Sequence, residues 1–196
     1  MKAPFIYLAS ASPRRAALLD QIGVSHRIHA VAVTEDPTPG EPPGDLARRL
    51  ALIKARQAGT ETGGVAPVLA ADTVVALGGA CLGKPADRAE GLRMLERLSG
   101  TTHEVYTAIA LIAGGNEQLA LSVSRVTMRP TSPEERAAYW ATGEPADKAG
   151  GYAIQGHAAA FISRVEGSYS GVMGLPLFET AEMLRSAGWA AFSGKA

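Results

Sequence analysis

Residues suited to binding phosphate come directly after the first apolar segment of the chain. Ser10-Ala11-Ser12-Pro13-Arg14-Arg15 follows that segment, with Ser12 in the position of an N-cap and Pro13 as the first helical residue. Free amides and the partial positive charge at a helix N-terminus favour phosphate, and arginine adds bidentate donors. The pattern predicts phosphate contacts from Ser10, Ser12, Arg14 and Arg15. A plain N-cap with solvated arginines explains the same pattern.

A single carboxylate interrupts the apolar segment from Val68 to Leu77. Asp72 lies in its middle, and a carboxylate is costly to bury without a partner. We therefore expect Asp72 to hold a metal ion or to act as general base on a water molecule. The alternative is a strand that ends at Ala71, with Asp72 capping a turn.

Two lysines and one pair of carboxylates could complete such a site. Lys84 lies between a glycine and a proline, in a rigid turn that suits a phosphate contact. Lys54 lies on a helix, where a lysine usually faces water. Glu35 and Asp36 offer oxygen ligands of the kind that Mg²⁺ or Mn²⁺ prefers. Taken alone, adjacent carboxylates in a proline-rich loop are more simply explained without a function.

A second group of candidate residues lies in the glycine-rich region between residues 143 and 176. In Gly150-Gly151-Tyr152-Ala153-Ile154-Gln155-Gly156, the glycines allow close approach of a ligand, and Gln155 offers both an acceptor and donors. A tight turn with a solvated glutamine is the alternative. Residues 167–176 resemble a second loop that faces a ligand.

Several common types of site are absent from the sequence. The histidines His26, His29, His103 and His157 do not cluster, and no cysteine and histidine set has zinc spacing. The glycine-rich phosphate loop of many nucleotide-binding proteins and the nucleophile elbow of α/β-hydrolases are also missing.

The elements that must position these residues alternate between strands and helices. Their hydrophobic periodicity and turn signals, with one long hairpin around residues 114–116, predict an α/β fold on a mixed twisted sheet. We expect strands at 5–9, 28–33, 68–77, 105–112, 119–128 and 158–165, and helices from 13 to a stop at 23, over 46–57, across 92–98, from 133 to a stop at 143, and over 177–186.

The composition indicates a globular protein without a general attraction for polyanions. The 196 residues include 19 basic and 19 acidic side chains, so no net field favours nucleic acid or an anionic membrane. The lone Cys81 fits a reducing compartment, and no apolar run reaches the roughly 18–20 residues of a membrane span. We expect a cytoplasmic protein, with residues 1–196 forming a single domain of two closely apposed lobes.

Taken together, these segments resemble the Maf family of nucleoside triphosphate pyrophosphatases. The resemblance extends from Leu8 to Leu184, and five segments follow the family's order and spacing. They are residues 10–15, Ala71-Asp72-Thr73-Val74-Val75, Gly83-Lys84-Pro85, Asp147-Lys148-Ala149-Gly150-Gly151-Tyr152 and Gly174-Leu175-Pro176-Leu177.

The resemblance implies a two-lobed fold related to inosine triphosphate pyrophosphatases, with a nucleoside triphosphate bound in the central cleft. It also implies a divalent metal cation (Mg²⁺ or Mn²⁺), release of pyrophosphate and a homodimer. Asp72 matches the family's catalytic acid-base residue. The phosphate and metal shell is matched by Arg14, Glu35, Lys54 and Lys84, and the positions associated with substrate choice by Arg14, Thr73 and Gln155.

Within the family, two segments resemble the branch that acts on dTTP and UTP. They are Tyr152-Ala153-Ile154-Gln155-Gly156 and Gly167-Ser168-Tyr169, whereas the 7-methyl-GTP branch carries Phe-Glu in place of Ile-Gln. The chain departs from the family pattern in placing Asp36 after Glu35, and in having His157. A 7-methyl-GTP pyrophosphatase and a non-enzymatic regulator of septum formation are the competing interpretations.

Overall fold

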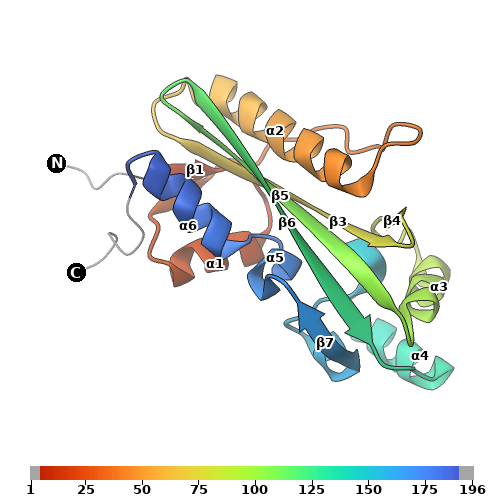
Figure 1. Cartoon of the computed structure of the whole chain (residues 1–196). Coiled ribbons are helices and arrows are strands. Elements are labelled where there is room, and N and C mark those ends of the chain that lie inside the picture. The colour runs from red at the N-terminus through yellow and green to blue at the C-terminus, as the bar shows by residue number, and fades with distance from the viewer. Residues whose placement is uncertain (1–4, 190–196) are drawn as a thin grey trace.

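A single mixed sheet forms the centre of the computed structural model, which describes residues 5–189 (Figure 1). The strand order is β2-β1-β3-β5-β6-β7, and β4 pairs with β3 off this path. Strands β1, β2 and β3 are parallel, and the remaining pairs are antiparallel. The predicted α/β class with a mixed sheet is confirmed. The strands are β1 (Ile6–Leu8), β2 (His26–Ile28), β3 (Val68–Leu77), β4 (Ala80–Leu82), β5 (Thr102–Ala113), β6 (Asn116–Met128) and β7 (Ile162–Glu166).

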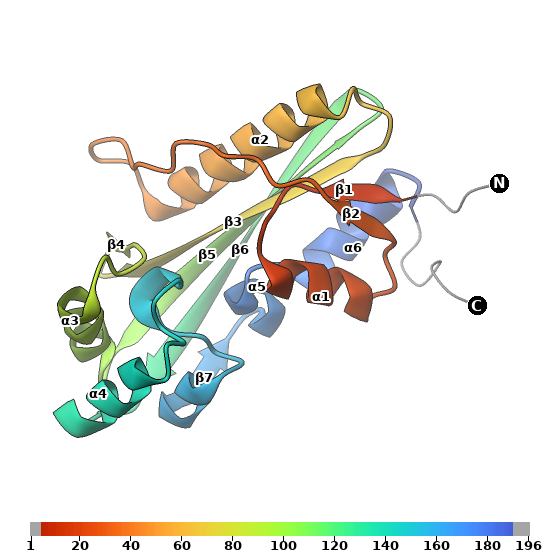
Figure 2. The same cartoon turned by 180° about the vertical axis from the view of Figure 1, so that it is seen from behind.

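The helices gather at the two ends of the long strands β3, β5 and β6. Helices α1, α2 and α6 surround one end, with α2 on one face of the sheet and α1 and α6 on the other, while α3 and α4 lie near the opposite end (Figures 1 and 2). That residues 1–196 form a single domain of two closely apposed lobes stays a prediction. The helices are α1 (Pro13–Gln21), α2 (Pro43–Glu61), α3 (Arg88–Leu98), α4 (Pro133–Ala141), α5 (Tyr169–Met173) and α6 (Leu177–Ser186), with 3₁₀ turns at Ala149–Gly151 and His157–Phe161.

Small side chains let α2 lie close to the sheet. The buried face of this helix consists largely of alanines, together with Leu46 and Leu50. It packs on Ala70 of β3 and on Ala108 and Ala110 of β5, all of which are fully buried. Short side chains on both surfaces bring the helix backbone near the strands. A long side chain in the middle of α2 can therefore reach the side chains of β3.

The prediction of a strand over residues 28–33 is wrong except at Ile28. Strand β2 covers only His26–Ile28 and pairs residue by residue with β1, which ends at Leu8. The amide of His29 still donates to the Leu8 carbonyl at 2.9 Å, but beyond it the neighbouring chain has turned toward α1. Because β2 is the outer strand of the sheet, the apolar residues after His29 have no other strand to pair with.

The bounds of several other elements also differ from the predicted ones, because pairing with strands far away in the sequence determines them. The expected strand over 158–165 begins as the 3₁₀ turn His157–Phe161, and only Ile162–Glu166 forms β7. Strands β5 and β6 and helix α2 are longer than predicted, and β4 and α5 were not predicted. In contrast, β3 and α6 have the predicted bounds. Within residues 5–189, no helix combines the length and the apolar character needed to cross a lipid bilayer.

The strand topology leaves part of one edge of β3 open. Strand β1 pairs with β3 only at Val68 and Leu69, and β4 pairs with it only from Val75 onward. Between these two partners, residues 70–74 have no neighbouring strand on that side among the described residues. Asp72 and Thr73 lie in the middle of this gap and, being adjacent on a strand, point to opposite faces of the sheet.

One buried histidine links the sheet to the loop that crosses its far end. His103 of β5 is 1% exposed, and its Nε2 lies 2.7 Å from the hydroxyl of Tyr152, which is also buried. Its Nδ1 has no hydrogen-bond partner among the described residues. Burial lowers the pKa of His103 to about 4 because the charged imidazolium would lose its hydration.

This depressed pKa predicts a loss of stability in mild acid. A histidine with a lowered folded pKa stabilises the fold above its unfolded pKa of about 6.5, and this contribution falls as the pH approaches about 4. Urea unfolding should show a pH-linked loss of about 3 kcal/mol between pH 7 and 4 that is missing in His103→Gln. Equal pH dependence of the unfolding free energy in the two proteins would contradict the assignment.

Candidate active site

A cavity of about 680 Å³ opens at the unpaired edge of β3. Its volume lies within the range of about 300–1,000 Å³ that is usual for small-ligand sites. The ten residues to which the sequence assigned a binding, metal or catalytic role all line this cavity, although they come from segments far apart in the chain. They are Ser10, Ser12, Arg14, Arg15, Glu35, Lys54, Asp72, Thr73, Lys84 and Gln155. Of the glycine-rich segments, Gly150, Gly151, Gly156 and residues 167–171 are not among the lining residues.

The centre of the site is a lysine held between two carboxylates. The Nζ of Lys54 lies 2.6 Å from Oδ1 of Asp72 and 2.5 Å from Oε1 of Glu35. The alternative in which Lys54 simply faces water is wrong, because Lys54 lies four residues from both Leu50 and Ala58 on the buried face of α2. The turn-cap alternative for Asp72 is also wrong, since β3 continues to Leu77.

The two carboxylates differ in their affinity for a proton. Burial raises the pKa of Asp72, and the charges of Lys54 and Arg15 only partly oppose that effect. Burial also acts to raise the pKa of Glu35, but this residue is half-exposed, and the hydrogen bond and charge of Lys54 lower the pKa below its ordinary value. Burial thus shifts the pKa of Asp72 in the direction that suits a proton acceptor, whereas the pKa of Glu35 shifts the opposite way.

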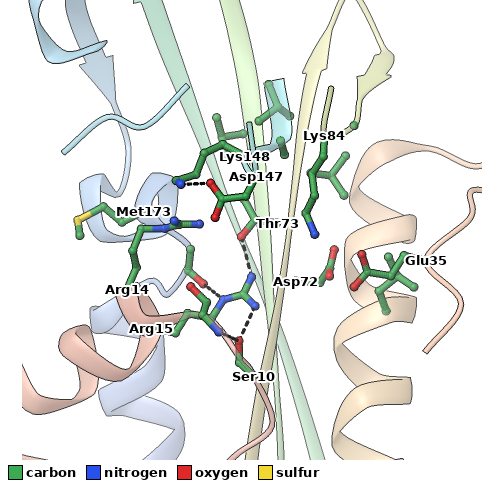
Figure 3. Close-up of a pocket in the computed structure, with 18 of the residues that line it drawn as sticks. Ser10, Arg14, Arg15, Glu35, Asp72, Thr73, Lys84, Asp147, Lys148 and Met173 are labelled. Carbon is green, nitrogen blue, oxygen red and sulfur yellow. Dashed lines mark hydrogen bonds and ion pairs between the residues drawn. The ribbon is translucent and has the colours of Figure 1, made fainter. Parts of the chain in front are cut away.

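Arg15 connects three segments at the wall of the cavity. Its Nε donates to the carbonyl of Gly174 at 2.8 Å, and its terminal nitrogens donate to Ser10 Oγ at 3.0 Å and Thr73 Oγ1 at 3.2 Å (Figure 3). These bonds join the start of α1, strand β3 and the loop before α6. Three N–H groups of Arg15 thus bond to the protein, so the geometry supports a positioning role for this arginine.

The same bonds determine which hydroxyl group donates and which accepts between Thr73 of β3 and Thr107 of β5. The Thr107 hydroxyl donates to the carbonyl of Gly171 at 2.7 Å, which uses its only proton. The Thr73 hydroxyl, 3.0 Å from Thr107 Oγ1, must therefore donate to Thr107 while it accepts from Arg15. With its proton used in this way, Thr73 can offer only a lone pair to a ligand in the cavity.

Two further cations face the cavity without a carboxylate partner. Neither Arg14 nor Lys84 lies within ion-pair distance of a carboxylate in the described part of the chain. Arg14 extends from the first turn of α1, and Lys84 from the turn after β4, so they approach from opposite sides (Figure 3). Ser12 occupies the N-cap position of α1, but its side chain makes no capping bond, and its own amide donates to Ser10 Oγ.

The structure adds residues that our choice of site residues omitted. Asp147 and Lys148 form an ion pair at the wall of the cavity beside Arg14, and Met173 lies near them (Figure 3). Asp147 and Lys148 belong to one of the five segments that carry the family resemblance, and only Ala149 separates them from the paired glycines. Their position close to that glycine turn was a usable signal. Met173 lies in the predicted ligand-facing segment 167–176, but helix α5, which was not predicted, determines that Met173 reaches the cavity.

Two carboxylates at this site could bind a cation, although they do not form a complete cage. No cluster of three or more histidine, cysteine, aspartate or glutamate side chains with the geometry of a metal site occurs within residues 5–189. Glu35 and Asp72 each use one oxygen on Lys54 and retain a second oxygen. A metal held by one or two carboxylates, with its other positions filled by water and phosphate, is the usual arrangement for Mg²⁺.

Comparison with known proteins shows which family and which relatives this chain resembles. A family model described as Maf-like protein matches residues 5–187. The chain is 54% identical over 187 residues to a dTTP/UTP pyrophosphatase of Alkalilimnicola ehrlichii, with 92% of each chain covered. It is 51% identical over 196 residues to a dTTP/UTP pyrophosphatase of Burkholderia pseudomallei (strain K96243), with 94% of each covered. A solved HAM1 protein from Coxiella burnetii aligns with a TM-score of 0.46 and 21% identity, over 64% of this chain and 73% of that chain.

The central ion pair predicts a large asymmetry between single and double substitutions. Lys54→Met leaves Asp72 buried without its cation and should lower the free energy of unfolding by about 3 kcal/mol. Adding Asp72→Asn removes the unpaired charge and should recover most of that loss. Lys84→Met, at an exposed lysine of the same cavity, should change stability by less than about 0.5 kcal/mol. Urea unfolding tests all three proteins, and equal losses for the two lysines would exclude a structural ion pair.

Proposed function

We propose that this chain, which belongs to the Maf family, hydrolyses dTTP and UTP to the nucleoside monophosphate and pyrophosphate. The observation that carries the proposal is the convergence of a buried Asp72, whose pKa is raised, with the unpaired cations Arg14 and Lys84 in one cavity. Relatives about half identical to this chain over more than nine-tenths of its length carry the name of that activity. A free Cys81 fits the reducing cytoplasm, where these substrates occur.

The charges of the cavity suit a triphosphate. Such a ligand brings about four negative charges, and catalysis of phosphoryl transfer depends mainly on positioning and charge stabilisation. Arg14 and Lys84 offer donors from opposite sides of the cavity, and Lys148 adds a third cation whose charge Asp147 moderates. These side chains would bind the phosphate tail and stabilise the charge that develops on the leaving pyrophosphate.

Asp72 is the residue placed to activate water. In the proposed reaction, water attacks the α-phosphorus, the new oxygen–phosphorus bond forms, and the bond to the bridging oxygen of pyrophosphate breaks. Asp72 accepts the proton that the attacking water loses, and its raised pKa favours this role at neutral pH. Lys54 holds the carboxylate in place and keeps it ionised before the attack.

Glu35 and Asp72 are the residues that would hold a divalent cation. Both carboxylates retain an oxygen that Lys54 does not use, and triphosphate oxygens and water would complete the coordination shell. A bound Mg²⁺ or Mn²⁺ would supply charge neutralisation at the phosphates. That the chain forms a homodimer stays a prediction.

The base would lie at the opposite end of the cavity, beside Gln155. Uracil and thymine present a carbonyl acceptor next to an N–H donor, and one glutamine amide can pair with both. Cytosine presents the reverse order, which the same amide matches only after rotation by half a turn. Selectivity for uracil and thymine therefore requires that Gln155 be held in place relative to the phosphate site.

The activity can be tested with a panel of triphosphates. Pyrophosphate release from dTTP and UTP should exceed that from CTP and 7-methyl-GTP, and Asp72→Asn should lower kcat by about 10² or more because an amide cannot accept the proton. The control Asp45→Asn changes an exposed carboxylate of α2 and should leave kcat unchanged. Absence of pyrophosphate with every triphosphate would exclude the enzyme, and a preference for 7-methyl-GTP would exclude the pyrimidine assignment.

The metal proposal has its own test. Turnover of dTTP should stop when a chelator is added and return with Mg²⁺ or Mn²⁺. Glu35→Gln should raise the metal concentration needed for half-maximal rate by about tenfold or more, because a ligand loses its charge. Glu41→Gln alters a carboxylate that pairs with Arg49 outside the cavity, and it should not change that concentration. Full turnover in the chelator would contradict the metal requirement.

A further inference from the structure

Gln155 lies on a tight turn that a backbone hydrogen bond closes. The Gly156 amide donates to the Ala153 carbonyl at 3.0 Å, which closes the turn and leaves the Gln155 side chain exposed to the cavity. Ile154, inside the same turn, is buried in the core with Tyr152. One side of the turn is therefore fixed by apolar packing, whereas the position of Gln155 depends on how the two ends of the turn are held.

Both ends of the turn are bound by one pair of side chains. The Ala153 amide donates to the Tyr139 hydroxyl at 3.1 Å, and that hydroxyl donates to Oε1 of Glu144 at 2.6 Å. At the other end, the amide of His157 donates to Oε2 of Glu144 at 3.0 Å. Tyr139 comes from α4, and Glu144 follows the end of that helix. Neither residue is among the described residues that line the cavity.

Burial and charge make this pair rigid. Tyr139 is 3% exposed, and its ring packs edge-to-face on Phe161. Burial acts to raise the pKa of Glu144, but the donors from Tyr139 and His157 outweigh it and lower the pKa below its ordinary value. Glu144 is therefore an ionised carboxylate that only accepts hydrogen bonds, and bonds to a charged acceptor are stronger than neutral ones.

The sequence of the turn is fitted to this carboxylate. A Cβ atom at Gly156 would lie 2.0 Å from Oε2 of Glu144, so only glycine allows the carboxylate to reach the His157 amide. The side chain of His157 adds a contact, with Nδ1 3.1 Å from the same oxygen. Several independent features of the chain thus converge on holding this one turn.

We propose that Tyr139 and Glu144 are positioning residues that fix Gln155 for recognition of the pyrimidine base. This inference rests on the proposed function and deepens it. A glutamine side chain has several rotamers and two amide orientations, so it discriminates between bases only when its backbone has a fixed place relative to the phosphate site. The pair supplies that fixed place without touching the substrate.

The physical part of the proposal can be tested without any substrate. Hydrogen exchange should be about tenfold faster at the amides of Ala153 and His157 in Tyr139→Phe and in Glu144→Gln, because each change weakens an anchor of the turn. Glu135→Gln is the matched control: it weakens the capping box of the same helix α4 but has no bond to the turn. Unchanged exchange in both variants would overturn the proposal.

The functional part is tested by the ratio of kcat/KM for UTP and CTP. Tyr139→Phe and Glu144→Gln should lower this ratio about tenfold, through a higher KM for UTP with kcat changed by less than about twofold. Ribose 5-triphosphate, which has no base, should be hydrolysed as in the wild type. Gln155→Ala should lower the ratio equally, and adding Tyr139→Phe to it should cause no further change, because both act through one interaction.

Four results would count against the inference. Equal losses with UTP, CTP and ribose 5-triphosphate would indicate general damage to the fold, and so would a lowered ratio in Glu135→Gln. Additive effects of Tyr139→Phe and Gln155→Ala would mean that they act separately. A wild-type chain that releases no pyrophosphate from any triphosphate would overturn the proposed function and the specificity role with it, while the exchange rates would still report whether the pair holds the turn.

Discussion

The burial of one carboxylate in the central sheet constrains much of this structure. Asp72 lies in the middle of β3 and is 7% exposed, so its charge requires a partner at close range. Lys54 supplies that partner only because α2 lies near the sheet on a face of small side chains. The same ammonium group attracts Glu35 from a loop that has no regular structure of its own. The two ion pairs of Lys54 therefore connect helix α2, strand β3 and the loop that carries Glu35.

The position of the cavity follows from strand pairing. Strand β1 leaves β3 after Leu69, and β4 joins it only at Val75, so the open edge between them exposes side chains from both faces of the sheet. Ligands of α/β proteins commonly bind where the chain diverges at the carboxyl ends of parallel strands. Here the divergence places the N-terminus of α1 on one side of Asp72 and the turn with Lys84 on the other (Figure 3).

The sequence predicted the side chains that line the cavity better than the contacts that hold them. Asp72 and Gln155 were found because a carboxylate in an apolar strand and a glutamine among glycines are unusual. Lys54 carried a local signal, its spacing from Leu50 and Ala58, that pointed to the buried face. Strand β2 was misjudged because its length depends on where β1 ends. Tyr139 and Glu144 had no local signal, since their partners are backbone amides 13 or 14 residues away.

Two separate hydrogen-bond networks hold segments that line the cavity. Near Asp72, Arg15 and the hydroxyl groups of Thr73 and Thr107 connect α1, β3 and the loop before α6. Tyr139 and Glu144 hold the turn of Gln155, and no hydrogen bond among the described residues joins the two sets. Because couplings between distant, unconnected groups are usually small, a substitution in one network should have little effect on the segments that the other network holds.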